Sequence, residues 1–228
     1  KTKSGTQIKV LRVRNIMGDQ LYHFIDGVRV GGTSGRQGDI FNPATGEVVR
    51  SVPLANAKDV RNAVDSSAAA QPGWGATPPA KRAQVMFNFR DLVIKNIDEL
   101  ANLVSEEHGK TIEDAKGSIS RGLEVVEFAC GIPQVLKGEY SESVAAGVDS
   151  YGIRQPVGIC AGITPFNFPA MVPMWMFPVA LACGNAFVLK PSERDPSCGL
   201  KLAELLIQSG LPAGVLNVVN GDKEAVDS

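Results

Sequence analysis

The sequence predicts an α/β protein in which residues 156–228 form a doubly wound parallel sheet, preceded by helices and hairpins. Three short segments, "VGICAGI", "AFVLK" and "GVLNVV", are apolar without interruption, and helical patterns over 168–183 and 196–209 separate them. Such strands, alternating with helices, indicate a parallel sheet that is covered on both faces and joined by right-handed crossovers. We therefore expect a β-α-β-α-β unit at this end of the chain.

Two hairpins are predicted near the start. In "YHFIDGVRV", two short apolar runs flank Asp26-Gly27, which is typical of a two-residue hairpin turn. "DIFNPATGEVVRSV" repeats the pattern, with the turn over 43–46. Both segments are therefore predicted to form antiparallel strand pairs.

Amphipathic helices are expected between these hairpins and residue 137. Asn56 is a good N-cap for the first helix, whose apolar residues recur at helical spacing up to residue 71. We expect Pro72 and the glycines that follow it to end this helix. Further helices are predicted over 78–95, 97–108 and 111–129.

Residues 138–155, "GEYSESVAAGVDSYGIRQ", are polar and alternating, as in an extended hairpin. A projecting hairpin that is unpaired within its own domain can pair with strands of a partner. The predicted organisation is an N-terminal arm with possible disorder (1–20), a helical and hairpin part (21–137), the projecting hairpin (138–155) and the β-α-β-α-β part (156–228).

Composition excludes several classes of function. The 228 residues are 44% hydrophobic and 21% charged with a net charge of -1, which is ordinary for a globular protein and gives no basic surface for nucleic acid. The apolar run after Asn167 is too short and too rich in proline for a membrane span. Four cysteines without a Cys-x-x-Cys pair and two scattered histidines predict reduced thiols and no metal centre.

The two ends of the chain carry separate expectations. Residues 1–16 are basic, and three interpretations remain open: a targeting remnant, a surface arm, or sequence ahead of a start at Met17. Asp222 can cap a further helix, but only about one turn follows it, and so short a helix is unstable by itself. We expect the chain to be a portion of a longer protein.

A ligand is expected beyond the carboxyl ends of the parallel strands, where "TPFNFP" and "PSER" follow two of them. No glycine-rich dinucleotide fingerprint is present. Lys190 and Glu193 could form a weak surface ion pair, or they could hold the two hydroxyls of an adenine ribose. In the second interpretation the carboxylate repels a 2′-phosphate and favours NAD over NADP.

Asn167 is a polar residue in an almost wholly apolar stretch. It could cap the following helix, or its amide could stabilise the oxyanion of a substrate carbonyl, and the spacing favours neither interpretation. Cys160 lies nearby in sequence, but it sits in an apolar strand without a cationic neighbour. Its pKa should therefore be raised, which is unsuitable for a nucleophile.

These segments together resemble a known family. "GITPFNFPAMVPMWMFPVALACGNAFVLKPSERDPS", "FIDG", "FNPATGE", "ELANLVSEEHGKTIEDAKG" and "GLEVVEFACGIPQVLKGEY" are similar, in order and spacing, to the aldehyde dehydrogenase superfamily. Within it they are most similar to the CoA-acylating methylmalonate-semialdehyde dehydrogenases. The resemblance extends from His23 to the end of the chain and implies the N-terminal part of that fold, with a Rossmann-like NAD-binding domain and without the C-terminal catalytic domain.

The resemblance also implies roles for individual residues. Asn167 matches the oxyanion-hole asparagine, and Arg121 matches an arginine that holds the substrate carboxylate. For Arg121 an ion pair with Glu124 or Glu127 on the same helix is the alternative. The implied cofactor-binding residues are Ile163, Thr164, Pro165, Phe166, Lys190, Glu193 and Arg194.

The implied activity is NAD-dependent oxidation of methylmalonate or malonate semialdehyde to propionyl-CoA or acetyl-CoA through a cysteine thioester, with coenzyme A as co-substrate. The catalytic cysteine is expected outside these residues. The resemblance further implies a homodimer or homotetramer joined through 138–155, and a place in valine or inositol breakdown. We expect the bacterial cytoplasm rather than the mitochondrial matrix. The alternatives are an aldehyde dehydrogenase that releases a free acid and a non-catalytic protein that retains the fold.

Overall fold

The computed structural model describes residues 20–228, so the predicted N-terminal arm lies almost entirely outside the described residues. The strands are β1 (His23–Ile25), β2 (Val28–Val30), β3 (Gln37–Phe41), β4 (Val48–Pro53), β5 (Tyr140–Ala145), β6 (Val148–Tyr151), β7 (Ile159–Ile163), β8 (Ala186–Lys190) and β9 (Leu216–Val218). The helices are α1 (Ala57–Ala76), α2 (Pro79–Lys95), α3 (Ile97–His108), α4 (Ile112–Cys130), α5 (Ile132–Val135), α6 (Met171–Ala182), α7 (Ser197–Gln208) and α8 (Lys223–Asp227).

The central sheet has five strands in the order β2-β1-β9-β8-β7. Its β7, β8 and β9 are parallel and alternate with α6 and α7, which confirms the predicted doubly wound unit. The N-terminal hairpin extends this sheet, because β1 pairs antiparallel with β9 and places Phe24 opposite Val218. The sequence predicts the hairpin but not its place in the sheet, which depends on contacts between residues nearly 200 positions apart.

The turn between β1 and β2 has the predicted two-residue geometry. Asp26 and Gly27 have φ values of 54° and 73°, as a type I′ turn requires. The buried Asn217 on β9 fixes this turn, since its side-chain oxygen accepts a hydrogen bond from the Asp26 amide at 2.8 Å. The second predicted hairpin forms a separate two-stranded sheet of β3 and β4.

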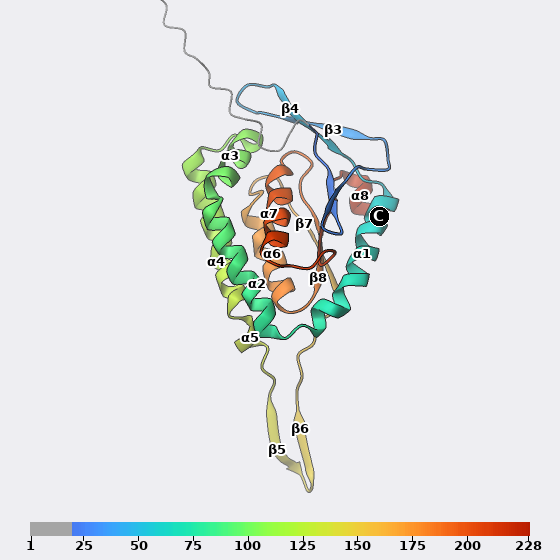
Figure 1. The fold of residues 1–228 in the computed structure, drawn as a ribbon, viewed down its shortest axis with the longest axis vertical. Coiled ribbons are helices and arrows are strands. Elements are labelled where there is room, and N and C mark those ends of the chain that lie inside the picture. Colours follow the sequence, from blue (N-terminus) through green and yellow to red (C-terminus); the bar gives the residue numbers. More distant parts are fainter. Residues whose placement is uncertain (1–19) are drawn as a thin grey trace, which may run out of the picture.

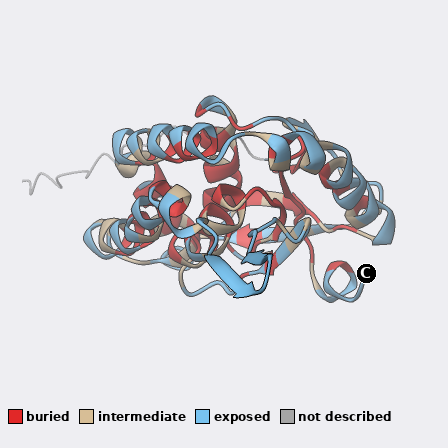
Figure 2. Cartoon of the chain, turned by 90° about the horizontal axis from the view of Figure 1, so that it is seen from below, coloured by how far each residue is buried: buried red, intermediate tan, exposed pale blue. Residues whose placement is uncertain are grey.

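The helices form layers around the sheet (Figure 1). α1 packs against β7, β8 and β9, while α6 and α7 pack against the sheet and are covered in turn by α2, α3 and α4. Figure 1 shows α1 on one side of the sheet and the pair α2 and α4 on the other. Buried residues fill the space between these layers, and exposed residues form the outer faces of the helices (Figure 2).

The expectation that Pro72 and the glycines after it end the first helix is wrong, because α1 continues to Ala76. Tertiary contacts hold the additional turn. The indole of the buried Trp74 donates a hydrogen bond to the Leu181 carbonyl at 2.8 Å, and the Gln71 side chain donates to the Gly184 carbonyl at 3.1 Å. These bonds to the end of α6 and the residues beyond it outweigh the local helix breakers.

The start of the helix after Asn167 is also later than predicted. α6 begins at Met171 with Ala170 as its N-cap and without a side-chain capping bond. Pro169 precedes the helix, and it forms a turn with Ala170 in place of the expected first helical turn. By contrast, Asn56 caps α1 as predicted, through a capping box with Asp59.

The polar segment 138–155 forms the antiparallel pair β5 and β6, which extends away from the body of the molecule (Figure 1). Every residue of the two strands is exposed. The short helix α5 precedes this hairpin and is not predicted from the sequence.

Candidate active site at the carboxyl ends of β7 and β8

The two polar segments that the sequence places after strands lie at one edge of the sheet. Ile163, the last residue of β7, is paired with Lys190, the last residue of β8. The amide of the buried Thr164 donates a hydrogen bond to the Lys190 carbonyl at 3.0 Å. The turn that carries Asn167 therefore starts directly beside Lys190.

Lys190 is held in one orientation by two oxygens. Its ammonium donates a hydrogen bond to the Gly221 carbonyl at 2.7 Å and lies 3.5 Å from the Glu193 carboxylate. The Lys190 side chain is 11% exposed and that of Glu193 is 43% exposed. The ion pair of the simpler interpretation is thus present, and it places an ammonium donor beside a solvent-accessible carboxylate acceptor.

Asn167 is exposed and does not act as a helix cap. Within residues 20–228, its side-chain amide has no hydrogen-bond partner. The capping interpretation is therefore wrong, and the amide is available to a ligand. The residues before it, Pro165 and Phe166, are also exposed.

Two cations lie against the aromatic residues of this turn. The Arg194 guanidinium lies 5.0 Å from the centre of the Phe166 ring, and the Lys110 ammonium lies 3.8 Å from that of Phe168. Such contacts stabilise partly exposed rings by roughly 0.5–1 kcal/mol each. They connect the turn after β7 to the loop after β8 and to the residues between α3 and α4.

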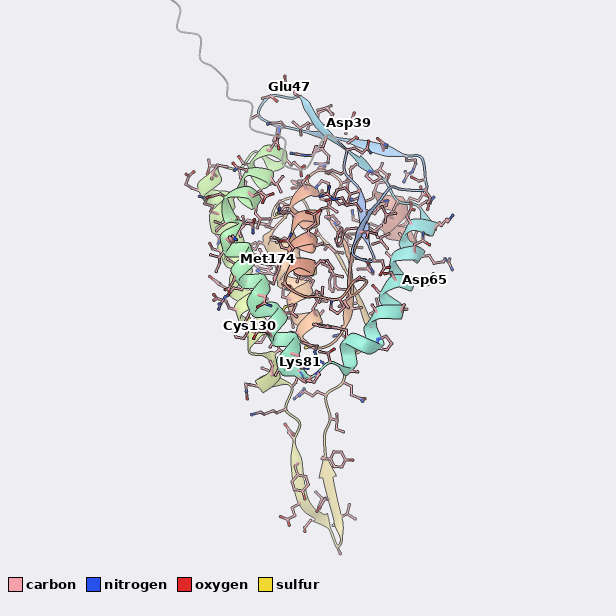
Figure 3. The ribbon with its side chains drawn as sticks, in the orientation of Figure 1. Asp39, Glu47, Asp65, Lys81, Cys130 and Met174 are labelled. Atoms are coloured by element: carbon pink, nitrogen blue, oxygen red, sulfur yellow. The ribbon has the colours of Figure 1, made fainter. Side chains whose placement is uncertain are left out.

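A cleft of about 590 Å³ opens beside these contacts. Its walls come from the hairpin of β3 and β4, the end of α3, the turn after β7 and the loop after β8. Figure 3 shows Asp39, one of the lining residues, on the β3 side. The lining residues are Gly38, Asp39, Phe41, Pro43, Leu54, Glu107, His108, Phe166, Glu193, Arg194 and Asp195. Three sequence-predicted residues therefore share one cleft: Phe166, Glu193 and Arg194.

The inner wall of the cleft carries two buried acids that the sequence analysis does not predict. Neither carboxylate oxygen of Asp195 has a hydrogen-bond partner within the described chain. Burial, and after it the charge of Glu107, raises the pKa of Asp195 to about 8. Burial also raises the pKa of Glu107 to about 7, although Ser197 and Arg50 hydrogen-bond to its carboxylate. The signal in the sequence is an acid in "SERDPS" directly after a strand end.

Arg121 is exposed on α4 and does not line the cleft. The alternative of an ion pair with Glu124 or Glu127 is not observed, because Arg121 forms no ion pair with any residue of the range 20–228. Its guanidinium is therefore unengaged by this part of the chain.

None of the four cysteines has the environment of a nucleophile. All four are free thiols, and burial raises the pKa of each one. Cys160, the cysteine nearest to Asn167 in sequence, follows this expectation. Arg82 lowers the pKa of Cys183 by less than burial raises it.

Two other kinds of site are not found among the described residues. The side chains of residues 20–228 contain no group of three or more His, Cys, Asp or Glu that could hold a metal ion. In the same range, no helix is long and apolar enough to cross a membrane.

Comparison with known proteins gives a consistent result. Residues 30–228 match the sequence model of the Aldehyde dehydrogenase family. The chain is 58% identical over 207 residues to a malonate-semialdehyde dehydrogenase of Pseudomonas aeruginosa, covering 91% of the chain and 41% of that relative. It is 53% identical over 190 residues to an acylating mitochondrial methylmalonate-semialdehyde dehydrogenase of Arabidopsis thaliana, covering 83% of the chain and 31% of the relative. The chain thus spans less than half the length of these curated relatives.

Solved structures agree with these relatives. A Sinorhizobium meliloti structure in complex with NAD, provisionally assigned as a methylmalonate-semialdehyde dehydrogenase, has a TM-score of 0.90 and 64% identity over 91% of the chain and 42% of its own. A methylmalonate-semialdehyde dehydrogenase of Oceanimonas doudoroffii has a TM-score of 0.90 and 54% identity over 92% of the chain and 43% of its own.

Proposed function

Because the chain belongs to the aldehyde dehydrogenase family, we propose that its protein oxidises malonate or methylmalonate semialdehyde with NAD and coenzyme A. The products are acetyl-CoA or propionyl-CoA. Residues 20–228 supply the cofactor-binding half, with the catalytic cysteine outside them. The observation that carries this proposal is the free amide of Asn167 on a turn that hydrogen-bonds to the backbone of the anchored Lys190.

The residues at the edge of the sheet fit the adenosine half of NAD. A ribose diol needs a donor and an acceptor side by side, and the Lys190 ammonium and Glu193 carboxylate are 3.5 Å apart. The backbone of residues 163–166 would line the pyrophosphate and nicotinamide side, and Arg194 would contact the cofactor beside them. NAD, when bound, supplies the hydride acceptor. The negative charge of Glu193 favours NAD over NADP by repelling a 2′-phosphate.

Asn167 is proposed to stabilise the oxyanion that forms when a cysteine thiolate attacks the aldehyde carbonyl. The amide is exposed and has no partner in residues 20–228, so it can donate both hydrogens without breaking an existing bond. A preorganised donor of this kind is typically worth about 10²–10³ in kcat. The raised pKa values of the four cysteines are consistent with a nucleophile outside these residues.

Arg121 is proposed to bind the substrate carboxylate, for which its unpaired guanidinium offers a bidentate donor. Loss of hydride converts the cysteine adduct to a thioester, and the thiol of coenzyme A then displaces the cysteine. Decarboxylation gives the shorter acyl-CoA. A water acceptor would instead release a free acid.

The hairpin of β5 and β6 is proposed as an oligomerisation arm that joins two or four copies of the protein. It extends away from the body of the molecule and exposes Tyr140, Val144 and Tyr151, which a partner strand could cover. We propose the bacterial cytoplasm as the location, with the mitochondrial matrix as the alternative.

The test uses the full-length protein with methylmalonate semialdehyde, NAD and coenzyme A. We expect NADH formation that depends on coenzyme A, with an acyl-CoA product by mass spectrometry. Asn167→Ala should lower kcat about 10²–10³-fold with little change in NAD affinity. Asn102→Ala, a change of an exposed asparagine on α3, is the matched control. A free acid formed without coenzyme A would favour the hydrolytic alternative, and failure to bind NAD would favour the non-catalytic one.

A further inference from the structure

The ammonium of Lys190 owes its position to the turn that follows β9. This turn, residues 219–222, starts where the Val219 amide donates to the Leu189 carbonyl at 2.9 Å. Two residues later, the Gly221 carbonyl accepts the hydrogen bond from Lys190 at 2.7 Å. The Gly221 carbonyl therefore holds the ammonium by a hydrogen bond, while the Glu193 carboxylate attracts it from 3.5 Å away.

Asn220 fixes this turn and is completely buried. Its side-chain amide donates to the Tyr22 carbonyl at 2.6 Å, and its backbone carbonyl accepts from the Ala55 amide at 3.0 Å. Its backbone amide donates to the imidazole Nδ1 of His23 at 3.1 Å. His23 is thus the side chain that satisfies the buried backbone donor directly before Gly221.

The His23 ring has a hydrogen bond at Nδ1, whereas its buried Nε2 has no hydrogen-bond partner among the described residues. Because Nδ1 accepts a hydrogen bond, a neutral ring carries its proton on Nε2, which lies 3.9 Å from the Asp59 carboxylate. Asp59 is itself held by the Thr33 amide at 3.0 Å. A Cβ at Gly32 would lie 3.1 Å from Nε2, which is a tight contact, so glycine at this position lets the backbone pass close to the ring without displacing it.

We propose that His23 is a positioning residue for the cofactor ribose, acting through Asn220 and Gly221 on Lys190. This inference rests on the proposed function of Lys190. His23 touches neither cofactor nor substrate in this scheme. Removing its acceptor leaves the Asn220 amide buried and unsatisfied, which the turn relieves by moving. The ammonium then loses the Gly221 carbonyl and closes the remaining distance to Glu193, which is 3.5 Å in this structure, so that the carboxylate acceptor for the ribose hydroxyl is occupied.

The test compares five variants of the full-length protein, of which Lys190→Ala removes the proposed ribose contact itself. His23→Ala removes the acceptor. His23→Asn keeps an acceptor at the place of Nδ1, and His23→Gln keeps a polar side chain but moves its acceptor toward the place of Nε2. Tyr22→Phe is the matched control, because it alters the buried residue directly before β1, whose hydroxyl bonds to Glu204 and not to the turn.

Binding of NAD, ADP-ribose and nicotinamide mononucleotide is measured by titration calorimetry. We expect His23→Ala and His23→Gln to weaken NAD and ADP-ribose by about five- to tenfold and to leave nicotinamide mononucleotide unchanged. His23→Asn and Tyr22→Phe should stay within about twofold of the wild type. Should His23→Ala fail to fold, the pair His23→Asn and His23→Gln provides the same comparison. Equal binding by His23→Gln and the wild type would overturn the inference.

Amide hydrogen exchange of residues 219–222 separates this inference from the proposed function. Faster exchange in His23→Gln than in Tyr22→Phe is expected whether or not the protein binds NAD, and unchanged exchange overturns the role of His23. If the wild type does not bind NAD, the proposed function fails, and exchange alone then decides whether His23 holds the turn. If Lys190→Ala weakens NAD while His23→Gln does not, the proposed function stands and the inference is wrong.

Discussion

The choice between NAD and NADP should depend on the Glu193 carboxylate, and Glu193→Gln tests this dependence. The substitution keeps the shape of the side chain and an acceptor oxygen, but removes the negative charge beside Lys190. The ion pair that it breaks spans 3.5 Å and is partly exposed, so the free energy of unfolding should change by less than about 1 kcal/mol. The variant therefore separates cofactor selection from folding.

The size of the effect follows from the position of the carboxylate. A 2′-phosphate on a ribose bound here would lie roughly 5 Å from Glu193, where two unit charges repel by about 0.8 kcal/mol in water and about 3 kcal/mol at an effective dielectric constant of 20. Glu193 is 43% exposed, so an intermediate value of about 1–2 kcal/mol applies. NADP should bind roughly 5- to 30-fold better, relative to NAD, in the variant than in the wild type.

The assay is a titration of the wild type, Glu193→Gln and the control Glu124→Gln with both cofactors at two salt concentrations. Glu124 is exposed on α4, outside the lining of the cleft. The preference for NAD should decrease only in Glu193→Gln, and its decrease should be smaller at high salt because the charges are screened. Equal binding of NAD and NADP by the wild type would refute the role of Glu193.

Two other substitutions test the site from different directions. Arg121→Leu should raise KM for malonate semialdehyde by about 30- to 150-fold and leave propanal within about twofold, since only the acid offers a carboxylate. The position is exposed, so urea unfolding should change by less than about 0.5 kcal/mol, and an equal loss with both substrates would mark Arg121 as structural. For Asp195, the raised folded pKa of about 8 means that the native state binds a proton that the unfolded state releases above about 4, so stability should fall as pH rises from about 4 to 8. Between pH 6 and 8.5 the urea midpoint should fall less in Asp195→Asn than in the wild type. An identical dependence of the midpoint on pH in the two proteins would contradict the raised pKa.

Local patterns in the sequence determine much of this protein. Apolar strands that alternate with helices predict the parallel unit of β7, β8 and β9. Asp26-Gly27 predicts the turn between β1 and β2, because few other dipeptides tolerate two positive φ values. Asn56 marks the start of a helix through capping geometry that needs no distant partner. The rule that ligands lie beyond the strand ends also predicts that Lys190 and the turn of Asn167 share one edge of the sheet.

Only the tertiary structure decides the features that depend on residues far apart in the chain. Helix α1 continues past Pro72 because Trp74 donates a hydrogen bond to a carbonyl of α6, and local helix propensities do not include this distant partner. Asn167 and Arg121 each had a plausible local partner, and the fold provides neither, which leaves an amide and a guanidinium free for ligands. The link from His23 to Lys190 is also a tertiary feature, because it exists only where β1 pairs with β9. Hydrogen bonds and burial join such residues, and a linear pattern records neither.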